Sequence, residues 1–421
     1  MPPFSPPSSS GPPPPTRAAF AFILVTVTLD MLALGIMVPV LPKLVIQLEG
    51  GDIARAASVT GLFGFAWNAM QFLFSPLIGA ASDRFGRRPI VLLSNLGLGL
   101  DYVLMALAPN LGWLFVGRVV SGVTAATFST ATAYITDVSL PEKRAAHLGM
   151  IGAAFGLGFI VGPAMGGVLG QINLRLPFWV AASLSLANAA YGLFVLPESL
   201  SGERRTRVAW STANPVGSLA LLRSRPVVLG LSAVAFFDYV AHESLPSCFV
   251  VYTDYRYAWN ERQIGLVLAL VGVSTAVVQA ALIGPVVSRL GDRGALIAGM
   301  ALGAVGFAFY GAASSGNLFL IGVPFGALWG IANPALQALM TREVPATHQG
   351  RLQGAVSSLR GIGGMIGPIL FTQTFAAAIR PRAHLPWPGA PYLLAAALLV
   401  TCAAVSAHVA RTPEPAPRAA S

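Results

Sequence analysis

The chain has 421 residues, of which 55% are hydrophobic and only 10% are charged, with 45 Gly and 32 Pro. Soluble domains carry about 25% charged residues, so this composition excludes an ordinary soluble protein and indicates an integral membrane protein. The formal net charge of +10 does not indicate nucleic-acid binding, because the basic residues lie in short clusters between apolar runs and form no continuous stripe.

The chain opens with a tail and continues as a series of apolar stretches. Residues 1–16, MPPFSPPSSSGPPPPT, are too rich in Pro and Ser to bury a core, which predicts a disordered tail, and they lack the basic n-region and cleavage site of a signal peptide. Each stretch that follows is long enough to cross about 30 Å of hydrocarbon as a helix. Twelve are predicted, at residues 18–41, 58–81, 90–109, 112–136, 147–170, 177–196, 226–250, 262–288, 294–313, 316–340, 350–378 and 389–410.

The distribution of basic residues predicts the topology of these spans. If the N-terminus faces the cytoplasm, seventeen of the 26 Lys and Arg residues fall in cytoplasmic segments, seven fall outside, and two fall within spans. The positive-inside rule therefore predicts a multi-pass protein with both termini in the cytoplasm and the lipid bilayer as a partner.

The first span contains an acid at its centre. Between Arg17 and Lys43 the only charged residue is Asp30. An Asp at the centre of a membrane helix costs roughly 2.5 to 3.5 kcal/mol on insertion scales, so such residues generally face a cavity and have a function. Burial also disfavours the charged form of a carboxyl group, which allows it to bind and release a proton.

Two further acids lie at the same depth as Asp30. Asp30, Asp101 and Asp238 each follow the last arginine before their span by 13 residues. At 1.5 Å per residue this is roughly 20 Å into the bilayer, so we expect all three around the midplane.

The chain contains an internal repeat. The loop GAASDRFGRR at 79–88 matches GPVVSRLGDR at 284–293 with an offset of 205 residues, and the same offset relates the pair Gly162-Pro163 to Gly367-Pro368. Duplication of a six-helix unit explains two motifs in one register. The predicted parts are an N-terminal half at 17–197, a cytoplasmic linker at 198–225, a C-terminal half at 226–410 and a cytoplasmic tail at 411–421.

Several motifs resemble those of a known superfamily. GAASDRFGRRP resembles the signature loop of major facilitator transporters, LFVGRVVSG at 114–122 resembles their fourth-helix motif, and GAAFGLGFIVGPAMGG at 152–167 resembles their antiporter motif. More narrowly, LDMLALGIMVPVLP, SDRFGRRP, LGLDY and GAAFGLGF resemble the tetracycline/proton antiporter branch of the drug efflux family.

The resemblance implies a fold and an activity. The fold is an all-α membrane protein with twelve helices in two parallel-repeat halves and a substrate site between them. The activity is export of a lipophilic cationic or metal-chelated drug, similar to tetracycline, in exchange for protons by alternating access. It further implies a bacterial inner membrane, a proton gradient as the energy source, no cofactor and no resident metal, although the substrate can carry a divalent metal. The oligomeric state is left open, and a monomer would suffice.

The resemblance assigns the signature loop as a conformational latch between the halves. Its residues are Gly79, Asp83, Arg84, Gly86, Arg87 and Arg88. Charge-assisted bonds of this loop would form in one state and break in the other. A plain positive-inside turn is the alternative, but that turn needs no acid. In the second copy Ser288 replaces Asp83, so we expect an asymmetric latch.

The antiporter motif is rich in glycine. Its residues are Gly152, Gly156, Gly158, Gly162, Pro163, Gly166 and Gly167. Spacings of four place several glycines on one helical face, where another backbone can approach closely. Tight packing alone and a sliding interface or leak seal are both compatible with this pattern.

The motifs and the acids within spans define the candidate site. We expect Asp30 to be the main proton and substrate carboxylate, with Arg118 tuning it or relaying its proton, and Asp101 to contact substrate. Asp238 and His242 stand at i and i+4, so they form either a titrating pair or a polar packing pair. The weaker candidates are Arg360, which would neutralise one of the acids, and Gln279 and Asn333, which would line the cavity.

Two positions depart from the tetracycline branch. Its ninth-helix aspartate aligns with Gly303, and its eighth-helix histidine aligns with Thr275. These departures leave proton-coupled efflux intact but weaken tetracycline as the substrate, and Asp238, His242 and Glu243 either supply the missing charge or indicate another ligand.

Other functions remain as alternatives. One is an exporter of a different metabolite or sugar, and another is a non-transporting receptor of the same fold. An enzyme is not expected, because the sequence has no P-loop, no Cys/His ligand set and no nucleophile elbow. Cys248 and Cys402 lack metal-ligand spacing and are expected to be small buried hydrophobic residues.

Overall fold

The computed structural model describes residues 17–125, 127–200, 217–223, 225–380 and 387–409. The predicted tails, at 1–16 and 411–421, and most of the predicted linker lie outside these residues. The described elements are all helical. Ten helical stretches among them are long and apolar enough to cross a membrane.

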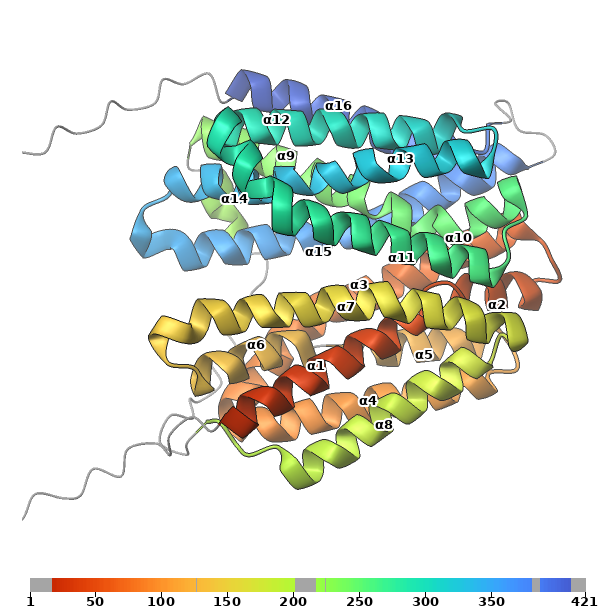
Figure 1. Cartoon of the computed structure of the whole chain (residues 1–421), viewed down its shortest axis with the longest axis horizontal. Coiled ribbons are helices and arrows are strands. Elements are labelled where there is room, and N and C mark those ends of the chain that lie inside the picture. The colour runs from red at the N-terminus through yellow and green to blue at the C-terminus, as the bar shows by residue number, and fades with distance from the viewer. Residues whose placement is uncertain (1–16, 126, 201–216, 224, 381–386, 410–421) are drawn as a thin grey trace, which may run out of the picture.

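The first six crossings come from α1 to α8 (Figure 1). They are α1 (Arg17–Met37), α3 (Ile53–Phe85), α4 (Arg87–Leu107), α5 (Leu111–Thr124) continued by α6 (Thr127–Val138), α7 (Pro141–Ile172) and α8 (Leu176–Val195), and the short helix α2 (Leu41–Leu48) follows α1. Helix α3 is not among the ten apolar stretches, but its 33 residues are enough to cross the bilayer.

The second six crossings come from α9 to α16. They are α9 (Pro226–His242) with α10 (Ser244–Tyr257), α11 (Glu261–Val277) with the π-helical turn η4 (Val278–Leu282), α12 (Ile283–Ala312), α13 (Gly316–Leu328) with η5 (Trp329–Ile331) and α14 (Ala332–Arg342), α15 (Gln349–Ile379) and α16 (Ala390–Val409). Short 3-10 turns, η3 (Gly217–Arg223) and η6 (Ala346–His348), precede α9 and α15.

One apolar stretch contains two crossings. The 52 residues Glu261–Ala312 are broken at Gly291, whose φ of 68° no helix accepts. The equivalent glycine of the first repeat, Gly86, has a φ of 107° and separates α3 from α4. With this split and with α3, the ten apolar stretches become the twelve predicted crossings.

The helices form two groups that meet along two seams. Figure 1 shows α1–α8 below α9–α16, and α3 packs on α15 while α7 packs on α11 across the boundary. On the first seam Gly64 of α3 leaves room for Pro368 of α15, 2.8 Å from the position of a Cβ. On the second seam Gly265 of α11 lies directly against the Pro163 carbonyl and Gly167 of α7. Glycine at these positions is what lets the backbones approach.

The seams do not run the full length of the helices. Gly152, Gly156, Ile160, Pro163 and Gly167 lie on one face of α7 by their spacing. Ile160 packs beside Gly272 of α11, but no other element lies within 4 Å of a Cβ at Gly156 or Gly152. The α7–α11 seam therefore ends near Ile160, and the two helices part beyond it.

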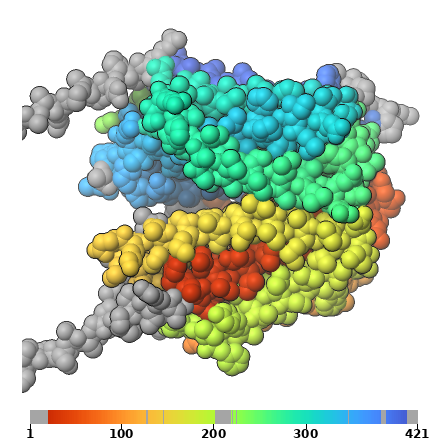
Figure 2. Space-filling model, in the orientation of Figure 1, coloured from red at the N-terminus to blue at the C-terminus, as the bar shows by residue number. Residues whose placement is uncertain are grey.

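The same separation occurs on the first seam. Phe72 of α3 packs against Gly361 of α15, and the contacts of Asn68 and Gly64 follow toward the far end. The halves part at the end of the molecule where α1 begins and α16 ends (Figure 1). The space-filling view shows a hollow there between the two groups of helices (Figure 2). We call this hollow the cleft; it is open at the end that carries both described termini.

Candidate functional site

The inner end of the cleft carries charged side chains from the second group of helices. Arg360 of α15 precedes Gly364 by one turn, and Gly364 lies against Asn68 of α3, with Asn68 Oδ1 2.7 Å from the position of a Cβ. Arg360 is exposed, and its guanidinium lies over the Tyr239 ring of α9, 4.9 Å from the centroid. Because the seam ends at this level, Arg360 lies where the halves begin to part.

Helix α9 ends beside Arg360. His242, its last residue, is exposed, and its ring lies 5.5 Å from the ring of Trp329 in η5. Asp238, one turn earlier, is buried and accepts a hydrogen bond of 2.8 Å from Trp329 Nε1. The structure thus brings Asp238, His242 and Arg360 together, with Trp329 as a partner that the sequence did not indicate.

Trp329 also explains the glycine at position 303. A Cβ on Gly303 of α12 would lie 2.8 Å from Trp329 Cγ and 2.9 Å from Leu399 Cδ1. The indole therefore occupies the space that a side chain at this position would need. Trp329 therefore contacts both Gly303, where the tetracycline branch has an aspartate, and Asp238, an acid of this chain.

A second polar group lies in the first half. Arg118 of α5 is half-buried and stacks over the Trp67 ring of α3, 5.3 Å from its centroid. Asp101 of α4 is buried, is an electrostatic neighbour of Arg118, and has its Oδ1 2.8 Å from the position of a Cβ on Gly117. The structure thus makes Arg118 an electrostatic neighbour of Asp101, whereas the sequence led us to expect it beside Asp30.

Asp30 does not line the cleft as the sequence suggests. Its carboxylate is buried and accepts a 3.0 Å hydrogen bond from Asn188 Nδ2 of α8, which also donates to the Thr26 carbonyl at 3.1 Å. With the Asn95 amide nitrogen of α4 oriented toward Asp30, Asn95 donates to both carboxylate oxygens, at 3.0 and 3.2 Å, and accepts from Asn188. The face of α1 that carries Asp30 therefore packs into the interior of the first half.

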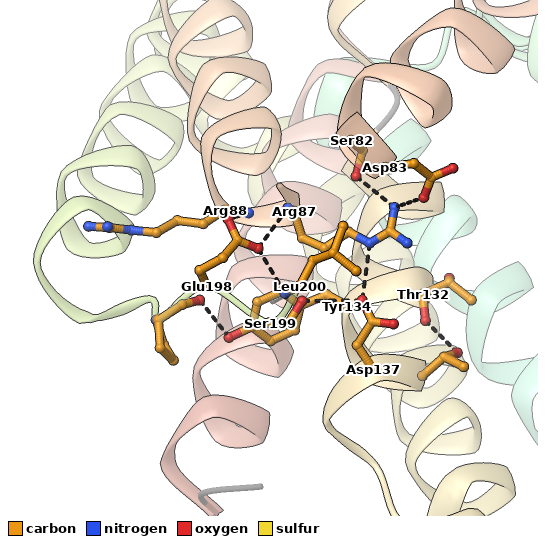
Figure 3. Close-up of polar contacts among 12 residues, drawn as sticks. Ser82, Asp83, Arg87, Arg88, Thr132, Tyr134, Asp137, Glu198, Ser199 and Leu200 are labelled. Atoms are coloured by element: carbon orange, nitrogen blue, oxygen red, sulfur yellow. Dashed lines mark hydrogen bonds and ion pairs between the residues drawn. The ribbon is translucent and has the colours of Figure 1, made fainter. Parts of the chain in front are cut away.

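The signature loop makes its described contacts within the first half (Figure 3). Arg87 pairs with Asp83 at 2.5 Å and with Asp137 of α6 at 3.1 Å, while Glu198 accepts from the Arg87 backbone N–H at 2.9 Å. The side chain of Asp83 is half-exposed, and among the described residues it forms no ion pair with the second half. The role of the loop as a latch between the halves therefore stays a prediction.

The repeat preserves one of these ion pairs with its charges exchanged. Adding the offset of 205 to Arg87 and Asp137 gives Asp292 and Arg342. Asp292 and Arg342 are paired at 2.7 Å in the second half, as Arg87 and Asp137 are in the first. This pair is not visible in a comparison of identical residues between the repeats, because the two positions exchange opposite charges.

The halves are joined at the end opposite the cleft by a cluster of charges. Lys43 of α2 forms an ion pair with Asp254 of α10, lies 3.9 Å from Glu261 of α11, and donates to the Trp259 carbonyl at 2.9 Å. We call these four residues the clasp. No sequence pattern indicates the clasp, because its partners lie in different halves.

The other predicted residues lie in separate places. Gln279 is exposed within the π-helical turn η4, which precedes Pro285, a residue that cannot continue regular helical hydrogen bonding. Asn333 is half-buried at the start of α14. Gly158, Gly162 and Gly166 pack against α1, whereas Gly167 packs against α11. Cys248 and Cys402 are buried and free.

This architecture is that of a membrane transporter built from two six-helix halves. The family model for the Major Facilitator Superfamily matches residues 23–368 and 234–421, so the chain belongs to this superfamily of transporters and is not an enzyme. The expected superfamily, fold and kind of activity are confirmed.

The relatives narrow the class further. The tetracycline resistance protein of class C from Escherichia coli is 39% identical over 384 residues, covering 91% of this chain and 95% of that protein. The class G protein from Vibrio anguillarum is 35% identical over 92% of this chain and 96% of that protein. Among solved structures, the nucleoside transporter NupG has a TM-score of 0.76 at 12% identity and covers 94% of this chain and 100% of that one. A bacterial homologue of the human lysosomal transporter Spinster, inward-facing and unoccupied, has a TM-score of 0.76 at 16% identity and covers 94% and 98%.

Proposed function

We propose that this transporter exports a tetracycline-like drug in exchange for protons by alternating access. The observation that carries the proposal is the identity of 39% and 35% to tetracycline resistance proteins over more than nine-tenths of the chain. The neighbouring Asp101 and Arg118 and the buried Asp30 support it from the site. The energy source is the proton gradient, and neither a cofactor nor a resident metal is required.

The open cleft represents one of the two transport states. The clasp closes the opposite end, and both described termini lie at the open end. Together with the excess of basic residues on that side, this supports an inner-membrane protein whose termini are cytoplasmic. The structure then corresponds to the inward-facing state, in which the drug enters from the cytoplasm. A monomer is sufficient for this cycle.

Asp30 is the proton carrier in this proposal. An ionised carboxylate only accepts hydrogen bonds, whereas a protonated one also donates. The Asn95 amide lies against Asp30 and can present either its nitrogen or its oxygen, so it can partner both forms. Because Asp30 lies inside the first half, it senses protonation without touching the substrate, and a change in its bonds to α4 and α8 alters the packing of α1.

The residues of the cleft contact the substrate. Arg118 supplies the first half of the site, with Asp101 buried behind it, and Arg360 and His242 supply the second half, with Asp238 buried behind them. Asp238 and His242 are two titratable groups one helical turn apart, and both are electrostatic neighbours of Arg360, through which proton release can be coupled to substrate binding. Gln279 and Asn333 are the weakest candidates, because neither has a described contact to these groups.

Drug accumulation in cells tests the proposed function. We expect a pump-deficient bacterial host that expresses the wild type to accumulate less tetracycline than the host alone, and a protonophore to abolish the difference. Unchanged accumulation despite confirmed expression in the membrane would refute tetracycline as the substrate.

One observation favours a second candidate function. Trp329 occupies the space at Gly303 where the tetracycline branch has an acid, so the site differs in shape from that branch. A proton-coupled exporter of a different small molecule would fit this difference. Protection against other compounds, without protection against tetracycline, would support the second candidate.

A further inference from the structure

The charged group exposed at the inner end of the cleft is the guanidinium of Arg360. The ring of His242 is exposed near it, and Arg118 is half-buried in the first half. The acids of the same region are turned into the helices: Asp238 is buried and held by Trp329, and Asp101 is buried beside Gly117. The exposed charge that a substrate meets at this point is therefore that of Arg360.

Arg360 faces this surface by its position on α15. Gly364 and Gly367, four and seven residues later, lie on the same helical face. Gly364 contacts Asn68 of α3, and Gly367 contacts Glu243 at the end of α9. Arg360 precedes Gly361, which packs against Phe72 of α3, so it lies at the end of the seam, where the two halves part.

The guanidinium of Arg360 has room for a ligand. One face of it lies over Tyr239, and within the ranges that the structure describes it forms no ion pair with a carboxylate. Glu243, four residues after Tyr239, is half-buried, and its Cβ and Cγ pack against Gly367. Asp238 and Glu243 are electrostatic neighbours of Arg360, but neither forms a described ion pair with it, so the N–H donors that do not contact Tyr239 are available to a ligand.

We propose that Arg360 binds an ionised oxygen group of the substrate, so that the exported drug is a metal-free compound with a carboxylate, enolate or phenolate. A guanidinium presents parallel N–H donors that match two such oxygens, and Tyr239 and Trp329 provide aromatic surface beside it. A divalent metal chelated by the same oxygens would bring its positive charge against Arg360. This inference rests on the proposed drug export and revises the metal-chelated form that the resemblance implied.

Transport by everted membrane vesicles tests the form of the substrate. We expect lactate-driven uptake of radiolabelled tetracycline by the wild type to proceed equally with EDTA and with added magnesium. Arg360→Gln should raise KM by about tenfold or more, because it removes a charge-assisted pair of hydrogen bonds. Arg360→Lys should fall between the two, and Arg351→Gln, which removes an exposed arginine of the same helix away from the site, should match the wild type. Uptake that requires magnesium, or a KM for Arg360→Gln within twofold of the wild type, would overturn the inference.

Binding measurements separate this inference from the proposed function. If the wild type takes up no tetracycline in either buffer, the proposed function fails, and purified protein is then titrated with nalidixate, an aromatic carboxylate, and with tetraphenylphosphonium, a lipophilic cation. Binding of nalidixate that is lost in Arg360→Gln and retained in Arg351→Gln supports the inference. Binding of the cation alone, binding of neither probe, or equal nalidixate binding by Arg360→Gln overturns it. A thermal unfolding midpoint within a few degrees of the wild type confirms that each variant is folded.

Discussion

The contact between Gly303 and Trp329 leads to a prediction about stability. A Cβ on Gly303 would lie 2.8 Å from Trp329 Cγ, and 2.9 Å from Trp329 Cβ and from Leu399 Cδ1. Carbon atoms in favourable contact are about 3.5 to 4.0 Å apart, so three contacts are too short by more than half an ångström. Overpacking of this kind costs about 1 to 3 kcal/mol. We therefore expect Gly303→Ala to lower the free energy of unfolding by this amount.

A nearby glycine provides the matched control. No other element lies within 4 Å of a Cβ at Gly330, which is the residue after Trp329. Gly330→Ala should therefore leave stability unchanged or raise it by about 0.5 to 1 kcal/mol, the usual gain when Ala replaces Gly in a helix. The comparison separates the effect of crowding from that of adding a methyl group to this part of the chain.

A double-mutant cycle then tests whether Trp329 is the cause. Trp329→Ala removes Cγ and the ring but also the hydrogen bond to Asp238, so it destabilises by itself. In its presence Gly303→Ala should cost at least 1 kcal/mol less than in the wild type, by the order of coupling that contacting residues give. The assay is equilibrium unfolding of purified protein in detergent. Equal stability of Gly303→Ala and Gly330→Ala, or a coupling near zero, would refute the reasoning.

Three other contacts give predictions of their own. Gly86→Ala should destabilise the protein by about 1 to 3 kcal/mol, because the φ of Gly86 is 107° and Glu198 fills the space of a Cβ. Gly79→Ala should leave stability unchanged, because the space of a Cβ at Gly79 is open. Equal unfolding midpoints of the two variants would contradict this prediction. Lys43→Gln should loosen the clasp and speed maleimide labelling of a cysteine placed at Ile46, against a background of two buried native cysteines; an unchanged labelling rate would mean that the clasp does not hold this end closed. Exchanging Arg342 and Asp292 together should preserve transport better than Arg342→Asp alone, and two variants of equal activity would rule out the ion pair as the reason.

The fold could be predicted because its signals are local or repeated. Apolar runs of membrane length, basic clusters between them and glycines at one offset each identify an element without reference to its neighbours. Two crossings within Glu261–Ala312 were separable in the sequence because the repeat assigned Gly291 the same turn as Gly86. The number and order of the crossings therefore follow from the sequence, whereas the helix ends differ from the predicted bounds by several residues.

The site could be predicted only in part, because its contacts are not local. Asp30 was recognised as costly, but its partner Asn188 is 158 residues away, and the spacing of α1 gives a face and not the helix that packs on it. Trp329 is 91 residues from Asp238, and an indole in an apolar span is more often read as packing than as a partner of an acid. Lys43 and Asp254 meet only because the halves close at one end.

Proton movement in everted vesicles tests the central claim most directly. Tetracycline added to energised vesicles that contain the wild type should release protons from the lumen, which a fluorescent probe of the pH gradient records. Asp30→Asn should abolish this release, whereas Glu142→Gln, which removes an exposed acid at the open end of α7, should retain it. Full drug-dependent proton release by Asp30→Asn, in vesicles with the wild-type amount of protein, would contradict the account of Asp30 as the proton carrier.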